Sequence, residues 1–450
     1  MEKNNFEELL NLLEKGDFSG LKQQISDMNV VDIAEFLETL ETPQLIRVFR
    51  ILPKDISADV FSYLETDDQT DIVSSITDSE LGSLVGNLFV DDAVDFLEEV
   101  PANVVTRVLA NTDQKTRQVI NTFLSYPENS AGSLMTNEMV ELHDSLTVAQ
   151  SIARIRSTGF DKETIYSCYC IDKGRHLIGT VTLSDLIFNN DAALIHDIMD
   201  ADDQLICVNT RDDQEDVAEI AKKYDLLSIP VVDNENRLVG IITIDDIVDI
   251  IEEENTEDFE KMALLTPSDD EYLKTPVIKL VKNRIVWLLI LMISATLTSK
   301  IIEGFENTLA LVVGLTASIP MLMGTGGNAA NQTSTLTIRG MALGEVKLGD
   351  YPKVLFKEVR VGLICGVILA VVNYARMWLL GSPGGSSVYL VTGMAMFFAI
   401  VVAKSIGCTL PMIAKILKLD PALMAGPMIS TMVDALTLVI YFSLARVFLM

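Results

Sequence analysis

Apolar residues are distributed differently in the two parts of the chain. From Ile285 onward they gather into long segments, at 285–302, 308–338, 356–379, 387–415 and 421–449. As a helix, each segment can cross about 30 Å of hydrocarbon at ~1.5 Å per residue. Pro320 and Gly324 in the second segment, and two glycines in the fourth, predict interruptions of those helices. The pattern therefore predicts a transmembrane domain of five helices over residues 276–450.

The first 130 residues follow another pattern. Their apolar positions recur with the period of a helix, and no alternation typical of strands is present. Similar segments begin at Asp32, Asp59 and Asp92, each leading into an apolar helix face. We therefore predict an α-helical superhelix of stacked hairpins, the N domain, over residues 1–130.

A repeat occupies the middle of the chain. The stretch 171–187 recurs 61 residues later as 232–248, each time as two β-branched runs around a polar turn, followed by a helical pattern. Amphipathic helical patterns precede the two copies, at 149–156 and 217–224. The repeat predicts two α/β units, and it resembles a tandem pair of CBS domains over residues 131–253.

The resemblance to CBS pairs implies that an adenine nucleotide such as ATP can bind between the repeats. In that family the acid closing each Thr-x-x-Asp can hold a ribose, and it corresponds to Asp185 and Asp246. Neither copy carries a glycine-rich phosphate loop. A pair of CBS domains that only dimerises and transmits conformational strain, without binding a nucleotide, agrees with the sequence equally well. Asp185 is the better candidate for nucleotide binding.

Acidic residues gather between the repeat and the membrane part. Asp and Glu recur from Asp245 to Asp258, and a helix is predicted to continue to about Lys274, with Pro267 and Pro276 marking breaks. We assign residues 254–275 to this connecting helix. Most acidic runs are solvated surface. At a domain junction, however, carboxylates repel each other, and a bridging divalent ion removes that repulsion.

Charge separates the two parts as clearly as hydropathy does. Mean hydropathy is +0.32 although the chain carries a net charge of −30. Residues 276–450 carry a net charge of +7 and residues 1–275 carry −37. These values exclude a single soluble enzyme domain and a protein that binds nucleic acid. No nucleophile–base pairing accompanies the three histidines, so we expect no enzyme, and the scattered cysteines predict no disulfide.

Basic residues also set the expected orientation. They lie before the first predicted span and in the second and fourth loops, whereas the first and third loops carry almost none. The positive-inside rule then places the amino-terminal domains in the cytoplasm and the carboxyl terminus outside. Met1–Asn5 leads into an acidic helical pattern, so no cleavable signal is expected.

Two features inside the predicted spans are unfavourable in a bilayer. Asp434 is the acidic residue of the fifth span, where a carboxylate costs at least ~2.5 kcal/mol. The second span carries glycines and amides from Gly324 to Gln332. Counted from the inner ends of their spans, Gly326 lies ~18 Å deep and Asp434 ~20 Å deep. Both features therefore reach the same level of the membrane.

Together these groups predict a site for a hard cation. A carboxylate with amide and carbonyl oxygens suits hydrated Mg²⁺, and the same logic admits Ca²⁺, Mn²⁺ and Na⁺. Close helix packing would also explain the glycines, and the hydroxyls of Thr431 and Thr437 would also satisfy Asp434. Neither of these alternatives explains why both features occur at one level.

With these residues in view, the whole chain resembles the MgtE family of bacterial magnesium channels and transporters. The domain order matches, as do Pro320, the Gly-Thr-Gly-Gly-Asn-x-x-x-Gln stretch that starts at Gly324, and Asp434. The resemblance implies a homodimer in the bacterial cytoplasmic membrane, with a largely hydrated Mg²⁺ at Asp434. The implied pore lining comprises Pro320, Gly324, Gly326, Gly327, Asn328, Asn331 and Gln332.

The same resemblance implies acids that bind regulatory Mg²⁺. The matching positions are Asp91, Asp95, Glu215, Asp225, Asp246, Asp249, Glu254, Glu257 and Asp258, with Asp59 a weaker match. Inward movement of a divalent ion gains about 4.6 kcal/mol per 100 mV, so the channel has to close when cytosolic Mg²⁺ suffices. Our hypothesis is that bound Mg²⁺ bridges the N domain, the CBS pair and the connecting helix, and draws that helix against the pore.

Two other functions remain open. An exchanger that couples Mg²⁺ to Na⁺ or protons would use the same pore residues, although proton coupling would need more titratable groups in the membrane than Asp434. A membrane-tethered adenine-nucleotide sensor without transport would need only the CBS pair. The amide-rich second span argues against that sensor, and intact uptake in Asp434→Ala would favour it.

Overall fold

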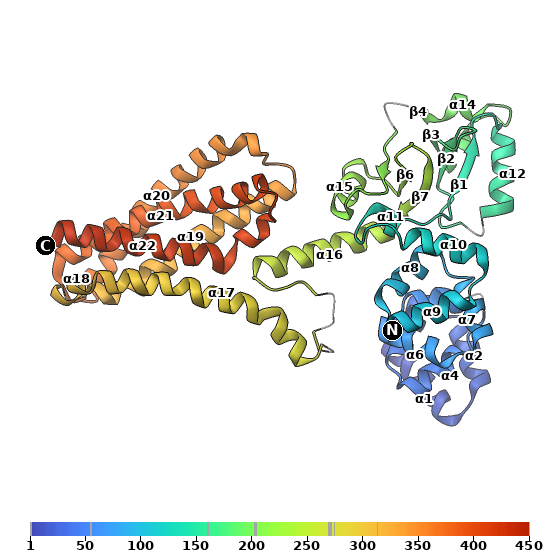
Figure 1. Ribbon diagram of the computed structural model, residues 1–450, viewed down its shortest axis with the longest axis horizontal. Coiled ribbons are helices and arrows are strands. Elements are labelled where there is room, and N and C mark those ends of the chain that lie inside the picture. Colours follow the sequence, from blue (N-terminus) through green and yellow to red (C-terminus); the bar gives the residue numbers. More distant parts are fainter. Residues whose placement is uncertain are drawn as a thin grey trace. The chain divides into compact units, whose positions relative to one another are not determined.

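The computed structural model describes residues 2–54, 56–159, 162–201, 205–268, 272–273, 275–312 and 314–449. The chain divides into two compact units, Met1–Ile251 and Glu252–Met450. Figure 1 shows the first unit as short helices in blue followed by a mixed α/β region in green, and the second as long helices in yellow to red. The helical, α/β and long-helix parts follow one another in the predicted order.

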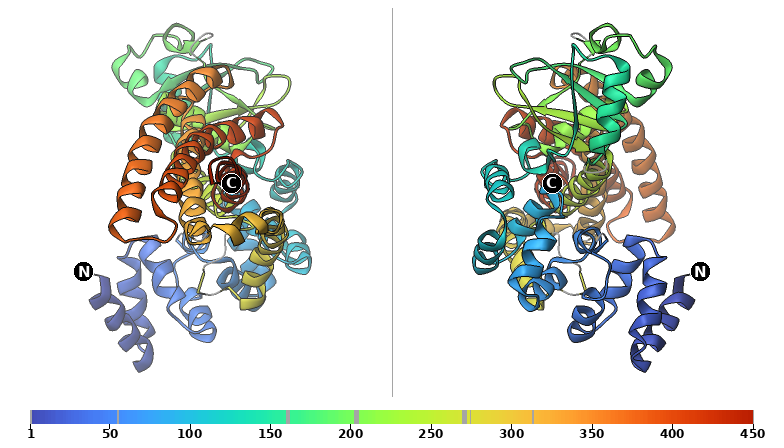
Figure 2. Two further views of the ribbon diagram at one scale, coloured as in Figure 1. Left: turned by 90° about the vertical axis from the view of Figure 1, so that its left-hand side faces the viewer. Right: turned by 90° about the vertical axis from the view of Figure 1, so that its right-hand side faces the viewer.

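Short helices fill the amino-terminal part of the first unit and stack as a superhelix, as predicted (Figures 1 and 2). In chain order they are α1 (Glu2–Lys15), α2 (Phe18–Ser26), α3 (Val30–Glu38), α4 (Thr42–Phe49), α5 (Ser57–Ser62), α6 (Thr66–Ser75), α7 (Asp78–Val85), α8 (Val90–Glu99), α9 (Ala102–Asn111) and α10 (Gln114–Phe123). Leu21, Ile33, Phe36 and Leu45 are fully buried between them. Helices this short are marginal alone, so burial of such side chains, at about 1.5–3 kcal/mol each, holds the stack together.

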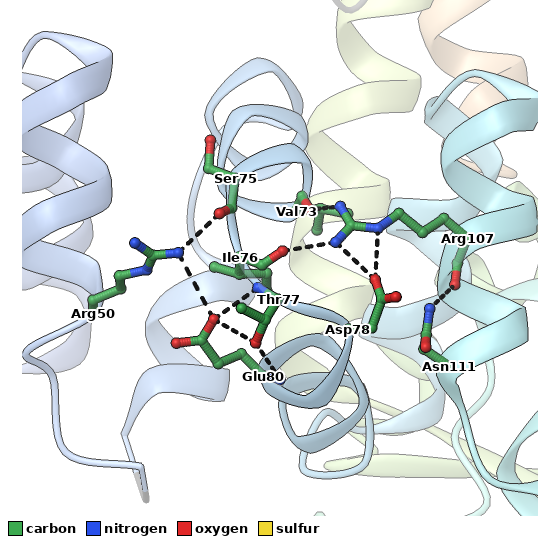
Figure 3. A network of polar contacts seen from close by, with 9 residues as sticks. All are labelled: Arg50, Val73, Ser75, Ile76, Thr77, Asp78, Glu80, Arg107 and Asn111. Carbon is green, nitrogen blue, oxygen red and sulfur yellow. Dashed lines mark hydrogen bonds and ion pairs between the residues drawn. The ribbon is translucent and has the colours of Figure 1, made fainter.

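Two arginines close the junction between α6 and α7 (Figure 3). The last carbonyl groups of α6 have no partner within the helix. Arg50 donates to Ser75 O at 2.9 Å, Arg107 donates to Ile76 O at 2.7 Å, and Arg107 also pairs with Asp78 at 3.0 Å. Because Arg50 follows α4 and Arg107 belongs to α9, these bonds tie successive helical pairs together.

The region after α10 contains two copies of one α/β unit, as the repeat predicted. Along the sequence, the first copy comprises α11 (Ala131–Leu134), β1 (Val140–His143), α12 (Val148–Thr158), β2 (Ser167–Ile171), β3 (Leu177–Thr182) and α13 (Leu183–Phe188). The second comprises α14 (Ile195–Ile198), β4 (Asp200–Ala201), which pairs with β3, then β5 (Val208–Asn209), α15 (Gln214–Tyr224), β6 (Ser228–Val232), β7 (Leu238–Thr243) and the start of α16 (Ile244–Met262). The strand pairing repeats: β1 is parallel to β2 as β5 is to β6, and β2 is antiparallel to β3 as β6 is to β7.

The two copies pack on each other through their hairpins. Leu177 N donates to Asn236 O at 3.1 Å, and Leu238 N donates to Arg175 O at 3.0 Å. These bonds join the β2–β3 turn to the β6–β7 turn, so corresponding segments of the repeats lie side by side.

The connecting helix differs from the prediction at both ends. α16 runs without a break from Ile244, inside the second repeat, to Met262, whereas the prediction placed this helix at 254–275. Leu264 then adopts a φ of 55°, the left-handed conformation that often ends a helix. The helix therefore stops before Pro267 is reached, and Lys274 lies outside the described residues.

Long helices make up the second unit, one for each of the five predicted spans. They are α17 (Val277–Gly304), α19 (Leu315–Ala342), α20 (Tyr351–Leu379), α21 (Gly385–Ile416) and α22 (Gly426–Leu449), with short α18 (Glu306–Leu311) after α17 and one-turn helices at Leu348–Asp350 and Pro421–Met424. Within the described part of the chain, Val277–Gly304, Gly385–Ile416 and Pro421–Leu449 are long and apolar enough to cross a membrane.

The predicted interruptions of the second and fourth spans are wrong. α19 continues through Pro320 and the glycine run at 324–327, and α21 continues through its own glycines. A Cβ added at Gly407 of α21 would lie 2.6 Å from Ala330 O of α19. Gly326, Gly327 and Gly407 therefore allow close packing of continuous helices, whereas Gly324 is exposed and meets no neighbour among the described residues.

Candidate functional site

Helices α19 and α22 place Gly326 beside the helix that carries Asp434. A Cβ added at Gly326 would lie 2.9 Å from Thr437 Oγ1 and 3.3 Å from Val433 Cγ1. Val433 directly precedes Asp434 on α22. Gly326 and Asp434 therefore lie at one level of the helix bundle, as the count along the sequence predicted.

One face of α19 carries small and polar residues that the single chain leaves exposed. They follow at intervals of four residues and so share a face: Pro320, Gly324, Asn328 and Gln332. Gly326 and Gly327 are instead buried against α22, which assigns these two predicted pore residues to helix packing. Asn331 Nδ2 donates to Ser430 Oγ of α22 at 3.0 Å, while its Oδ1 is buried without a partner.

A buried ion pair in the second unit was missed from the sequence. Lys404 of α21 is 6% exposed and its Nζ lies 3.8 Å from Glu358 Oε2 of α20. Thr333 Oγ1 of α19 donates to the same carboxylate oxygen at 2.9 Å and accepts from Lys404 Nζ at 3.2 Å. The membrane helices thus hold titratable groups besides Asp434, contrary to our expectation. The sequence signal that could have revealed this ion pair is Lys404, a charged residue within the predicted apolar segment 387–415.

Carboxylates from several elements of the first unit meet at the start of α16. Those that act on one another through their charge are Asp59 of α5, Asp91, Asp92 and Asp95 of α8, Glu138 and Glu163 of the first repeat, and Asp245, Asp246 and Asp249 of α16. We call this group the acid cluster. It brings together five predicted regulatory acids, and it adds Asp92, Glu138, Glu163 and Asp245, which sequence reasoning did not select.

Crowding raises the pKa of these carboxyl groups. Burial, followed by the charges of Asp92 and Asp246, raises the pKa of Asp91 well above its ordinary value. Burial, followed by the Asp246 charge, raises the pKa of Asp92 to about 7, and burial first of all raises the pKa of Glu163 to about 7. The pKa of Asp95 rises to about 8 for the same reasons, although solvent reaches this side chain and screens part of the effect.

Two oxygens of the acid cluster accept no hydrogen bond. Asp91 Oδ1 and Glu163 Oε2 are both buried and without a partner. Leaving such an acceptor unpaired costs ~1–3 kcal/mol, so these atoms point to a positive group that the protein itself does not supply. In the part of the chain that the structure describes, no three acids, histidines or cysteines converge closely enough to enclose a metal ion. The acid cluster is therefore an attractive surface for cations and not a finished coordination shell.

The remaining predicted regulatory acids lie apart from the acid cluster. Glu215 and Asp225 are exposed at opposite ends of α15, ~15 Å apart along the helix. Glu254, Glu257 and Asp258 lie on α16 beyond residue 251, within the second unit. The structure thus divides the predicted regulatory acids into separate groups.

Within the second unit, the end of α16 contacts the loop that leads into α22. Lys261 Nζ lies 2.8 Å from Asp420 Oδ2. Burial, followed by the Asp420 charge, raises the pKa of Asp258 to about 6. Gly426 has a φ of +54°, and a Cβ there would lie 2.4 Å from Met262 O. Sequence reasoning missed Asp420, because one acid in a short loop forms no pattern.

The two candidate nucleotide ligands, Asp185 and Asp246, have different surroundings. Each accepts a hydrogen bond from the threonine three residues earlier, at 2.5 Å and 2.8 Å respectively. Asp246 belongs to the acid cluster, which would repel a phosphate. Asp185 lies in the first turn of α13, whose first residue, Leu183, donates to the Tyr166 carbonyl oxygen at 2.9 Å, and the Tyr166 side chain is 64% exposed. The segment that contacts the start of α13 thus carries an exposed aromatic side chain on which a nucleoside base can stack, so the residues present favour Asp185 alone.

Three stretches of the chain match models of known families. Residues 28–129 match the MgtE intracellular N domain, residues 195–253 match the CBS domain, and residues 319–444 match MgtE, described as a divalent cation transporter. These matches fall on the superhelix, the second α/β copy and the long helices.

Full-length relatives show the same similarity. The chain is 33% identical to the magnesium transporter MgtE of Thermus thermophilus over 97% of both chains. It is 29% identical to the magnesium transporter MgtE of Bacillus subtilis, over 94% of this chain and 96% of the relative.

Two solved structures cover the cytosolic half. The soluble part of a magnesium transporter is 29% identical with a TM-score of 0.53, over 56% of this chain and 99% of that one. The cytosolic domain of the Mg²⁺ channel MgtE in complex with ATP is 32% identical with a TM-score of 0.51, over 54% of this chain and 98% of that one.

Proposed function

Because the chain belongs to the MgtE family of magnesium transporters, we propose that it admits Mg²⁺ to the cell as a channel and closes when cytosolic Mg²⁺ binds. The protein is a transporter and not an enzyme, and it combines an intracellular N domain with membrane helices. The observation that carries the gating proposal is the acid cluster, with its unpaired buried oxygens on Asp91 and Glu163.

The ion pathway follows the exposed face of α19 and passes Asp434. Asp434 supplies a negative charge at the level of Gly326, and the exposed Asn328 and Gln332 supply amide oxygens, whereas the amide of Asn331 is turned toward α22. Mg²⁺ gives up its water reluctantly, so these groups act by accepting hydrogen bonds from the hydrated ion. Polar residues facing lipid are unfavourable, so a second copy of the chain across this face supports the proposed homodimer.

Gating depends on repulsion between like charges. Without a cation, the carboxylates of α8 and α16 repel, which favours separation of the N domain from the second CBS repeat. A bound Mg²⁺ removes this repulsion and stabilises the packed arrangement. Moving a two-state gate from 1:99 to 99:1 needs ~5.5 kcal/mol, and a site at ten times its Kd supplies ~1.4 kcal/mol. About four weak sites therefore suffice, and the acid cluster, the ends of α15 and the end of α16 supply enough acids.

The end of α16 is the element that transmits closure to the pore. Its contacts with the loop before α22, through Lys261 and Met262, lie only a few residues before the span that carries Asp434. Glu254, Glu257, Asp258 and Asp420 surround this contact, so a cation here would hold the helix against the pore mouth. One continuous helix links these acids to Asp246 of the acid cluster, so a change at either end is carried along α16.

ATP is the second proposed ligand, and Asp185 is the residue that would contact its ribose. The similarity to a cytosolic domain in complex with ATP supports this assignment, as does the exposed Tyr166 ring beside α13. Bound nucleotide would add contacts to the CBS pair and so tune the Mg²⁺ dependence of the gate. The proposed location is the bacterial cytoplasmic membrane, with the carboxyl terminus outside.

Mg²⁺ influx into liposomes tests the pore. Asp434→Asn keeps the shape of the side chain and removes its charge, so we expect influx to fall at least about tenfold. Glu345→Gln, an exposed acid in the loop after α19, is the matched control and should leave influx unchanged. Unchanged influx in Asp434→Asn would exclude this ion pathway.

The same liposomes separate a channel from an exchanger. A channel needs only the Mg²⁺ gradient and the membrane potential, whereas an exchanger needs an opposing Na⁺ or proton gradient. Influx that stops when both opposing gradients are removed would replace the channel by the exchanger.

A further inference from the structure

A cavity of about 670 Å³ lies in the first unit between α10 of the N domain and the CBS pair. Its walls come from α10 and the residues after it, from β1 and α12, and from both hairpin turns of the repeats. Its volume lies within the range of small-molecule sites, ~300–1,000 Å³. We propose that this cavity binds a small organic anion that carries both a phosphate group and a flat ring.

The side chains that line the cavity carry a net positive charge, whereas the surrounding part of the protein is strongly negative. Residues 1–275 carry a net charge of −37, yet the cavity is lined by four cationic side chains, Arg154, Lys162, Arg175 and Arg237, and by two acids, Glu141 and Asp233. The cations outnumber the acids in this lining, so they repel one another locally, and a bound anion would offset that repulsion.

Two of the four cations are already engaged within the protein. Arg175 pairs with Glu141, and Arg237 pairs with Glu235 beside the cavity. Among the described residues, no carboxylate lies within ion-pair distance of Arg154 or Lys162. These two side chains therefore remain available for a phosphate, which accepts charge-assisted hydrogen bonds from both.

The same lining also offers an aromatic and apolar surface. Phe123 and Tyr126 lie edge to face with ring centroids 6.3 Å apart, and Leu238 and Met139 are buried behind the same cavity. The Tyr126 ring packs directly on Gly132, where a Cβ would lie only 2.6 Å from Tyr126 Cγ. The ring is thus held in place, and a flat ligand ring can stack on it or meet its edge.

This cavity is separate from the proposed nucleotide site. The cavity is lined at the hairpin turn by Arg175, which precedes β3, whereas Asp185 follows β3. The six residues of β3 place these two ends ~20 Å apart. Because one wall belongs to the N domain and the others to the CBS pair, an occupant contacts both and stabilises their packing.

The test is calorimetric titration of the full-length protein in detergent, without Mg²⁺, with pyridoxine 5′-phosphate as the probe. The expected result is one site per chain, with pyridoxine alone and inorganic phosphate alone each binding at least about tenfold more weakly. Inorganic phosphate binding as tightly as the phosphate ester would overturn the requirement for a ring. Absence of binding by the ester would overturn the proposal.

Charge variants locate the site. Arg154→Gln with Lys162→Gln should weaken binding of the ester at least about tenfold. The matched control, Arg156→Gln with Lys173→Gln, removes the same charge from exposed positions outside the cavity and should change Kd less than about twofold. Equal effects of the two pairs would overturn the assignment to this cavity.

A third variant keeps every charge. Thr122→Trp places a bulky ring in the cavity from the exposed face of α10, so it should abolish binding while the protein melts as before. Full binding in this variant would place the ester elsewhere on the molecule.

Discussion

Two groups of buried charge in this protein differ in whether the chain neutralises them. Glu358 in the membrane helices is accompanied by Lys404 at 3.8 Å and by the Thr333 hydroxyl at 2.9 Å. Asp91 in the acid cluster is accompanied by further acids, and its Oδ1 has no partner. The first group is complete within one chain and so serves structure. The second is incomplete, and the positive charge it needs has to come from solution, which makes it suitable for sensing a cation.

Removing one charge of the Lys404–Glu358 ion pair should change the stability of the protein more than any other substitution predicted here. Lys404→Met leaves Glu358 buried without a counter-charge, and we expect a loss of ~3–5 kcal/mol of stability, seen as low yield and a lower melting temperature in detergent. Lys415→Met, at the exposed end of α21, is the control and should melt like the wild type.

The double variant Lys404→Met with Glu358→Gln sharpens this test. It removes both charges, so it should recover most of the lost stability. If Lys404→Met alone melts like the control, the pair is not the compensated buried charge described above.

Neutralising an acid of the acid cluster should stabilise the protein, whereas Lys404→Met destabilises it. Asp91→Asn removes like-charge repulsion, so without Mg²⁺ we expect it to stabilise the protein by about 1–2 kcal/mol and to reduce the rise in melting temperature that Mg²⁺ produces. Thermal unfolding with and without Mg²⁺ measures both effects. Asp27→Asn, an exposed acid outside the acid cluster, should alter neither, and an undiminished Mg²⁺ effect in Asp91→Asn would contradict the role of this residue.

Protons should be released when Mg²⁺ binds, which is the smallest of the predicted effects. The pKa values of Asp92 and Glu163 are raised to about 7 from ordinary values near 4, so at pH 7 both are partly protonated in the packed arrangement. Raised carboxyl pKa values favour packing at low pH and disfavour it as the pH rises through 7. Mg²⁺ needs ionised ligands, so its addition at pH 7 should release at least about one proton per chain, with Asp91 and Asp95 adding to the release, and at pH 9 it should release fewer. Equal release at both values would contradict these pKa shifts.

Much of this arrangement follows from the sequence. The helical period placed Asp91 and Asp95 one turn apart, the repeat placed Asp246 at the start of a helix, and counting along the spans placed Gly326 level with Asp434. These predictions depend on local periodicity, which the chain carries in its own residues.

The remaining features depend on tertiary contacts that no local pattern reveals. Glu358 and Lys404 come from different helices, and Asp420 meets Lys261 only because α16 ends against the loop before α22. The continuity of α19 was also hidden. Glycines that break an isolated helix are tolerated where a neighbouring helix needs close approach.

Single-channel recording tests the central claim most directly. Inside-out patches of liposomes with purified protein should show unitary Mg²⁺-carrying currents that disappear as Mg²⁺ on the cytosolic face rises from micromolar to millimolar. Asp91→Asn with Asp246→Asn should keep the unitary current and shift closure to higher Mg²⁺, because the acid cluster then attracts the ion less. Closure at the same Mg²⁺ concentration in wild type and double variant would contradict a gate built on this cluster.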